Sequence, residues 1–157
     1  MASANYYSIK VTPTVLAGAA DADDVIFNPT KIPGAAPTLG GATRLLNVNV
    51  VYFDDYEGAL DLYFFENDTN DLGTLGAAIS MSDFRLKQNK LLGVMSIGGV
   101  TTGAVGDMVA ARAKTNTSAN MILQAASGSS DIFVAGVAQG AHTFTANGID
   151  LTFSFRS

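Results

Sequence analysis

The sequence predicts an all-β fold: an antiparallel β-sandwich, jelly-roll or Greek-key like, with one short helix. Several short segments alternate apolar and polar residues with period two. They recur roughly every 8–12 residues, with turn residues such as Gly98-Gly99 and Asn147-Gly148 between them. The chain has 157 residues, of which 48% are hydrophobic, which is enough for one buried core without disulfides.

The composition divides the chain at about residue 41. All four prolines lie between residues 12 and 41, among Ala and Gly, which discourages long helices and central strands. We therefore expect residues 1–40 to form an extended Pro/Gly/Ala-rich N-terminal arm with edge strands at Tyr6–Val11 and 25–27. Residues 41–157 are expected to form the β-sandwich domain.

Two strands are predicted at 44–53 and at Leu60–Phe65. In the first, Leu46, Val48, Val50 and Tyr52 share one face, which we expect to be the core face. The turn at 54–58 is short, so the two strands are expected to pair as neighbours.

The remaining elements follow from the same alternation and from helix signals. Strands are expected at 77–81, 92–97, 107–113, 119–125, 131–138 and Ile149–Arg156. The last has large apolar residues at every odd position. A short helix is expected at Asp83–Asn89, with Ser82 as its N-cap.

The charge balance limits the classes of partner and of chemistry. The net charge of −5 repels phosphate, so nucleic acid is not an expected partner. No apolar run approaches the roughly 20 residues of a membrane helix, and the N-terminus lacks a signal-peptide pattern. With no cysteine, a single histidine (His142, expected in a turn) and no nucleotide-binding or nucleophile-elbow motif, we expect neither an enzyme nor a cofactor.

Acidic residues are concentrated between residues 54 and 71 without any Lys or Arg. The oxygen-bearing side chains of Glu66, Asp68, Asn70 and Asp71 make this segment a candidate calcium site, although it does not match the EF-hand pattern. A solvated acidic patch at turns explains the same residues. A pair of hydrolytic carboxylates, such as Asp55 and Glu57, is a further alternative, but no Trp platform accompanies it.

Aromatic residues are concentrated in the strands at 44–53 and Leu60–Phe65. Phe53, Tyr63 and Phe65 lie on the face opposite the expected core positions. A subunit interface would explain them, because Tyr and Phe are enriched there. A second sheet or the N-terminal arm folded over that face would explain them equally well.

The order of strands and turns resembles small β-sandwich virion proteins of tailed bacteriophages. The resemblance covers residues 45–155 and is carried by GALDLYFF at 58–65, LGT at 72–74, AISMSD at 78–83, LGV at 92–94, ILQAASGSSDIFVAGV at 122–137 and TFTANGIDL at 143–151. It implies a structural virion protein, of the capsid cement or decoration type. Its partners would be the major capsid protein and itself, as a homotrimer, at the capsid surface after assembly in the host cytoplasm.

Low charge agrees with such a role. Only 15% of residues are charged, against about 25% in an average soluble domain, so partners are expected to cover much of the surface. An extended arm suits strand addition across a neighbour. The expected partner-binding residues are Tyr6, Tyr7, Pro29, Pro33, Pro37, Phe53, Tyr63 and Phe65. A tail-associated, receptor-binding or carbohydrate-binding module, with calcium in the acidic loops, is the alternative.

Overall fold

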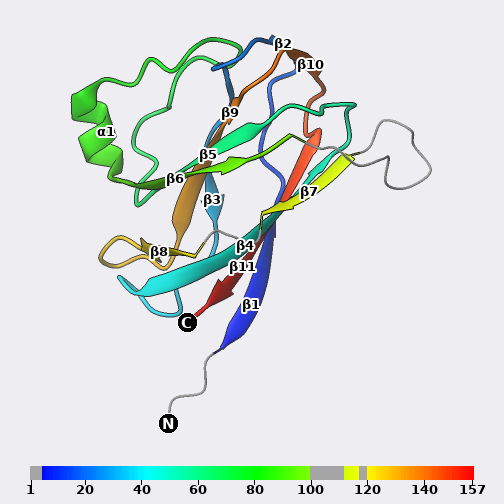
Figure 1. The fold of residues 1–157 in the computed structure, drawn as a ribbon. Helices are drawn as coiled ribbons and strands as arrows, with labels where there is room; N and C mark the ends of the chain where they lie inside the picture. Colours follow the sequence, from blue (N-terminus) through cyan, green and yellow to red (C-terminus); the bar gives the residue numbers. More distant parts are fainter. Residues whose placement is uncertain (1–4, 100–111, 117–119) are drawn as a thin grey trace.

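The computed structural model describes residues 5–99, 112–116 and 120–157 (Figure 1). In chain order its elements are β1 (Tyr6–Val11), β2 (Gly18–Ala20), β3 (Val25–Ile32), β4 (Ala42–Tyr52), β5 (Leu60–Phe65), α1 (Asp83–Asn89), β6 (Leu91–Ile97), β7 (Arg112–Asn116), β8 (Met121–Gln124), β9 (Ile132–Ala138), β10 (His142–Phe144) and β11 (Ile149–Arg156). No helix in this part of the chain is long and apolar enough to cross a membrane.

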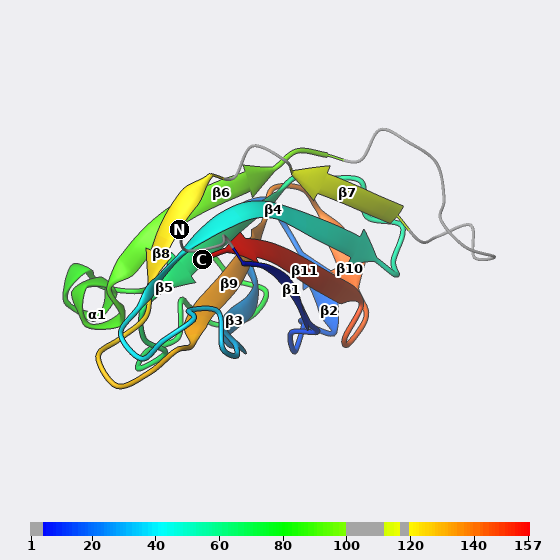
Figure 2. The same ribbon diagram turned by 90° about the horizontal axis from the view of Figure 1, so that it is seen from below.

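Two antiparallel sheets pack face to face (Figures 1 and 2). The first has the order β1-β11-β4, with β7 and β8 both pairing the far edge of β4; the second has the order β3-β9-β5-β6. Most neighbouring strands come from distant parts of the chain, which is the jelly-roll arrangement of two interlocked Greek keys. The predicted fold class is confirmed. β2 and β10 form a separate two-stranded sheet.

The strands β4 and β5 do not pair, contrary to the sequence prediction. β4 belongs to the first sheet and β5 to the second, so residues 53–59 cross between sheets that lie about 10 Å apart. The reason is that the apolar faces of the two strands meet across the core instead of side by side. Tyr56 is buried within this connection, and its hydroxyl donates to the carbonyl oxygen of Ala59 at 2.6 Å.

The segment before residue 41 is packed into the sandwich. It provides β1 and β3, which are edge strands of the first and second sheets, as predicted. Val15, Ile26 and Phe27 from this segment are buried in the main core. The predicted boundary at residue 41 therefore falls inside a sandwich to which both sides contribute strands.

Several element boundaries differ from the predictions. Residues 77–81 form no strand and make only an isolated bridge between Asp24 and Ala78. Of the strand expected at 107–113, residues 107–111 lie outside the described residues, and β7 begins at Arg112. In β4 the register shifts near Leu46, so Leu45 is the buried residue there. Such a bulge reverses the alternation locally and is invisible in the sequence pattern.

The predicted helix is present with its predicted cap. The side chain of Ser82 accepts a hydrogen bond from the backbone N–H of Arg85, and Lys90 ends the helix in the left-handed conformation. The helix belongs to the connection between β5 and β6, residues 66–90, which lies over the outer face of the second sheet. Beneath it a second apolar cluster is buried, formed by Val25, Phe65, Leu72, Phe133, Ala135 and Val137.

Candidate functional site

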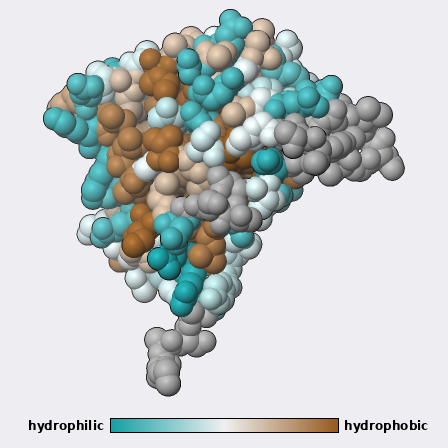
Figure 3. Space-filling model, viewed as in Figure 1, coloured by the Kyte–Doolittle hydropathy of each residue, from teal (hydrophilic) through white to brown (hydrophobic). Residues whose placement is uncertain are grey.

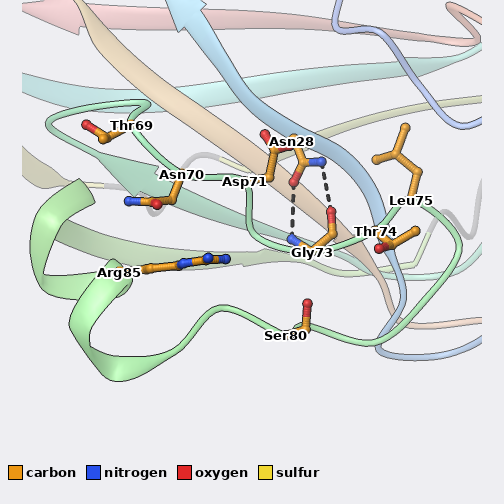
Figure 4. Close-up of a pocket in the computed structure, with 9 residues that line it drawn as sticks. All are labelled: Asn28, Thr69, Asn70, Asp71, Gly73, Thr74, Leu75, Ser80 and Arg85. Carbon is orange, nitrogen blue, oxygen red and sulfur yellow. Dashed lines mark hydrogen bonds between the residues drawn. The ribbon is translucent and has the colours of Figure 1, made fainter.

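Two asparagines fix the cover over the second sheet. The Asn28 side chain accepts from the backbone N–H of Leu72 at 2.8 Å. It also donates to the carbonyl oxygen of Gly73 at 2.9 Å (Figure 4). Asn89 is fully buried, donates to the carbonyl oxygen of Asn70 at 2.6 Å and accepts from its N–H at 2.9 Å. Residues 70–73 are therefore held against β3 and the end of α1 by side-chain hydrogen bonds.

An open hollow of about 530 Å³ lies between this cover and α1. Its lining is mostly polar and includes Asn28, Asp71, Ser80 and Arg85. Arg85 extends from the helix toward the hollow (Figure 4). A guanidinium at this position disfavours a bound cation and favours a ligand with hydrogen-bond acceptors.

Two of the four calcium candidates are bound to other side chains, and the other two are exposed. Glu66 forms an ion pair with Lys90, and Asn70 is bound by Asn89. Asp68 and Asp71 are exposed. Within residues 5–99, 112–116 and 120–157, no three His, Cys, Asp or Glu side chains come close enough together to hold a metal ion.

The structure separates the eight predicted partner-binding residues into several places. Tyr63 is half-buried and Phe65 is fully buried under the β5–β6 connection, so Phe65 is inaccessible to a partner and that prediction is corrected. The cover over Phe65 is neither a second sheet nor the N-terminal arm. Phe53, at the end of β4, is 51% exposed.

The candidates in the N-terminal segment lie at the other end of the sandwich or along β3. Tyr7 and Pro37 line one hollow together with Leu39. The hydroxyl of Tyr7 donates to the carbonyl oxygen of Ala35 at 2.8 Å. Pro33 is exposed, whereas Pro29 is half-buried within β3 at a register shift, where an edge strand tolerates proline.

The hollow beside Tyr7 continues along one flank of the molecule. Leu39 also lines a second hollow that contains Glu66 and Lys90, and Lys90 in turn lines a third with Leu86 and Leu91. Three hollows thus follow one another from the chain ends to α1. Leu39 is 70% exposed. No sequence pattern indicates it as a surface residue of interest, because a lone leucine in a loop belongs to no periodic pattern.

Apolar side chains remain exposed where the two sheets meet on this flank. Figure 3 shows hydrophobic residues gathered over α1, β6 and β8. The exposed ones are Phe84 on α1, Leu91 and Val94 on β6, and Ile122 on β8. Figures 1 and 2 agree that β6 and β8, which belong to different sheets, lie side by side here, and no ladder joins them.

Four exposed side chains form a row on the outer face of the first sheet. Tyr6 pairs with Arg156, Arg156 with Arg44, and Arg44 with Ile122, on the adjacent strands β1, β11, β4 and β8. The guanidinium carbon of Arg156 lies 5.7 Å from the centre of the Tyr6 ring. No sequence pattern indicates this row, because it depends on the register of four strands that are distant in sequence.

Negative charge gathers at the opposite end of the sandwich. Asp23 donates its N–H to the carbonyl oxygen of Ala138, beside the connection that carries Asp55 and Glu57. Burial raises the pKa of Tyr63, and the charges of Asp61 and Asp23 raise it further. The carboxylates of Asp23, before β3, and of Asp61, in β5, therefore both lie close enough to act on the Tyr63 hydroxyl.

The sequence matches no known family model and no curated protein. Among the solved structures that match the chain are those of viruses and of a viral coat protein. One such structure, of Tomato Aspermy Virus, has a TM-score of 0.41 at 11% identity, covering 99% of this chain and 78% of the other. The capsid of Ralstonia phage GP4 has a TM-score of 0.38 at 17% identity, covering 98% and 83%. A sugar-binding protein, the EclA C-terminal domain, has a TM-score of 0.30 at 10% identity, covering 100% and 81%.

Proposed function

We propose that this chain is a structural, non-enzymatic virion protein of the capsid cement or decoration type, which binds the major capsid protein and further copies of itself at the capsid surface. The observation that carries the proposal is the apolar flank formed by α1, β6 and β8, with Phe84, Val94 and Ile122 exposed. Exposed apolar side chains gathered in one place mark interaction surfaces in soluble proteins.

The shape of the flank supports a protein partner. The surface beside the flank is uneven, because three hollows follow one another along it. Leu39 and Lys90 each line two neighbouring hollows. A specific protein contact buries about 1,000 Å² or more in total. A convex or ridged coat surface that fits into the hollows would bury more area than it would against a flat flank. The low charge of the chain, 15%, agrees with a surface that partners cover.

Cosedimentation with preassembled coat-protein shells tests the proposal. We expect the purified chain to bind the shells and to raise their melting temperature. The double variant Val94→Asp with Ile122→Asp should bind at least about tenfold more weakly, because two charges would have to be buried in the contact. Ala141→Asp with Ala146→Asp is the matched control, since both alanines are exposed on other loops. Binding that is equal in both double variants would refute the assignment of this flank.

The size of the assembly is tested separately. Light scattering coupled to size-exclusion chromatography of the purified chain alone should give the mass of a homotrimer. A chain that stays monomeric and binds no shells would refute the proposed function as a whole.

A carbohydrate-binding module is the second candidate, favoured by the polar hollow of Figure 4 with Asn28, Ser80 and Arg85 in its lining. Amide, hydroxyl and guanidinium groups are the ones that bind sugar hydroxyls. Glycan-array binding that is lost in Arg85→Ala would support it. If calcium takes part, millimolar calcium should raise the melting temperature and EDTA should lower it; an unchanged melting temperature would exclude calcium.

A further inference from the structure

The two edge strands that come from the N-terminal segment differ in how their outer edges are covered. β3, at the edge of the second sheet, contains Pro29, and backbone groups of Val25 and Ile26 bond to residues 16, 76 and 77, outside the sheet. β1, at the edge of the first sheet beside β11, contains no proline, and no described residue pairs with its outer side (Figure 1). Natural proteins usually block exposed strand edges, so an open edge of this length is a surface on which another strand can be added.

The ladder with β11 determines which backbone groups of β1 point to this open edge. The N–H of Ser157 donates to the carbonyl oxygen of Asn5 at 3.0 Å. In an antiparallel ladder, residues that exchange hydrogen bonds with the partner strand alternate with residues whose N–H and C=O groups point away from it. Every second residue from Asn5 therefore bonds to β11, and the backbone groups of Tyr6, Ser8 and Lys10 point to the open edge.

The same three residues have exposed side chains on the outer face of the sheet. Lys10, the only charged residue of β1, forms an ion pair with Asp150 of β11 at 2.6 Å, so its charge is held away from the open edge. The hydroxyl of Ser8, between Tyr6 and Lys10, is hydrogen-bonded to that of Ser154 at 3.0 Å. The centre of the open edge is therefore small and uncharged.

β1 is complementary to itself when a second copy of it runs antiparallel, with Ser8 opposite Ser8. Tyr6 of each copy then lies opposite Lys10 of the other, where an ammonium group and an aromatic ring attract each other. On the inner face, Tyr7 of each copy lies opposite Ile9 of the other. Both side chains are only partly buried against the core, so the pairing would extend the core across the edge. A register centred on Lys10 would instead place two lysines opposite each other, which is unfavourable.

We propose that two copies of this chain pair through β1, with Ser8 of each copy at a two-fold axis, so that their first sheets form one continuous sheet. The pairs between Tyr6 and Lys10 and the pair at Ser8 exchange about six backbone hydrogen bonds. The inference rests on the self-association in the proposed function and names one contact by which it occurs. The occupant of the edge is a second copy, because the register centred on Ser8 gives every residue of the edge a compatible partner.

The symmetry and size of the contact determine its place in an assembly. A two-fold contact uses the same strand on both sides and joins copies only in pairs, so it is distinct from the contacts within the proposed homotrimer and would link one trimer to the next. A contact of one strand is smaller than a standard interface of about 1,600 Å², so we expect weak pairing in solution. Copies held side by side on a shell would pair more strongly, because their effective concentration is higher.

Cross-linking of single-cysteine variants detects such a weak contact. The chain has no cysteine, so each variant carries one thiol. Opposite residues of a hydrogen-bonded pair have Cα atoms about 5.5 Å apart, which a disulfide can bridge. With oxidised glutathione as the oxidant, we expect Ser8→Cys to form covalent dimers at least about tenfold faster than Ser80→Cys, whose exposed residue lies in the β5–β6 connection.

The register is tested by mixing two further variants. Tyr6→Cys and Lys10→Cys should cross-link with each other, whereas either alone should react at the Ser80→Cys rate, because its two thiols would be held about 14 Å apart. Ser8→Pro, added to both, should reduce this cross-linking to the same rate, since proline removes the N–H at the centre of the edge. Ser8→Ala keeps that N–H and should leave the cross-linking unchanged. Circular dichroism establishes that each variant is folded.

Equal cross-linking rates for Ser8→Cys and Ser80→Cys would overturn the inference. The same holds if Tyr6→Cys alone cross-links as fast as the mixture, because β1 would then pair in another arrangement. If the cross-linking fails and the chain still binds coat shells, the pairing alone has failed and the proposed function stands. If Ser8→Cys cross-links as expected but the chain binds no shells, the proposed function has failed and the pairing stands.

Discussion

Replacement of Gly136 by alanine should destabilise the sandwich strongly. Gly136 lies in β9, whose seven residues are all buried, and it pairs with Phe27 of β3. A Cβ atom at residue 136 would lie 2.1 Å from Cε1, 2.4 Å from Cζ and 2.8 Å from Cδ1 of the Phe27 ring. These distances are far inside van der Waals contact, so the ring has to move.

The size of the effect follows from the surroundings of that ring. Phe27 is 0% exposed and belongs to the main core, so its ring cannot turn toward solvent and must displace other core side chains. Overpacking of a core costs typically 1–3 kcal/mol, and three overlapping ring atoms place this case at about 3 kcal/mol. For a domain of this size that corresponds to a fall in melting temperature of roughly 6–12 °C.

Urea unfolding followed by circular dichroism measures the loss. Gly98→Ala is the control, because nothing lies within 4 Å of a Cβ at residue 98, and it should leave the midpoint unchanged. Phe27→Leu combined with Gly136→Ala should be less destabilising than the sum of the two single changes, since the smaller side chain makes room. If Gly136→Ala unfolds at the wild-type midpoint, the packing of β3 on β9 is not as described.

Three further predictions concern individual polar side chains. Asn89→Ala should lower the free energy of unfolding by about 1–3 kcal/mol, because the backbone N–H and carbonyl groups of residue 70 lose their hydrogen-bond partners. Hydrogen exchange in residues 66–90 should then become faster through local opening, before global unfolding. Unchanged exchange would contradict this prediction. Tyr52→Phe should leave the free energy of unfolding unchanged or raise it by up to about 1 kcal/mol. The buried hydroxyl of Tyr52 has no hydrogen-bond partner among the described residues, and burial raises its pKa. A decrease in the free energy of unfolding by more than about 1 kcal/mol in urea melts would argue against this prediction. Acid should destabilise the fold below about pH 4. The backbone N–H of Gly34 and the side chain of Lys31 lower the pKa of Asp131. At Asp150 burial raises the pKa, but the hydrogen bonds from Lys10 and Thr12 lower it further than burial raises it. Both folded pKa values lie below the unfolded ones, so this stability is complete above the unfolded pKa and is lost as pH falls through the folded values; unfolding free energies that are equal at pH 7 and pH 2 would refute it.

Alternation in the sequence was sufficient to predict most strands, and the Ser82 cap was sufficient to predict α1. Alternation with period two indicates which side chains of a strand face the core. All the long strands pack one face against the core, so all of them show this alternation. β2 and β10 were missed because three residues such as Gly18-Ala19-Ala20 are too few to show a period. Pairing was harder to predict, since alternation says which face is buried but not which strand lies beside it.

The cover over the second sheet shows why the aromatic residues were misread. The alternation places Phe65 on the outer face correctly, and an outer aromatic next to low charge is typical of an interface. Its actual partner is the connection of residues 66–90, whose position depends on the side chains of Asn28 and Asn89. Two asparagines in a strand and at a helix end carry no sequence signal for such a role.

The same limit explains why the row on the outer face of the first sheet has no signal in the sequence. Arg44 and Arg156 are 112 residues apart in sequence, and only the antiparallel register of β4 and β11, including its bulge, makes them neighbours. The acidic stretch at 54–71 is visible in the sequence as a segment without Lys or Arg, but the strand that pairs beside it is not: Arg112 of β7 is the ladder partner of Tyr52, which precedes this stretch.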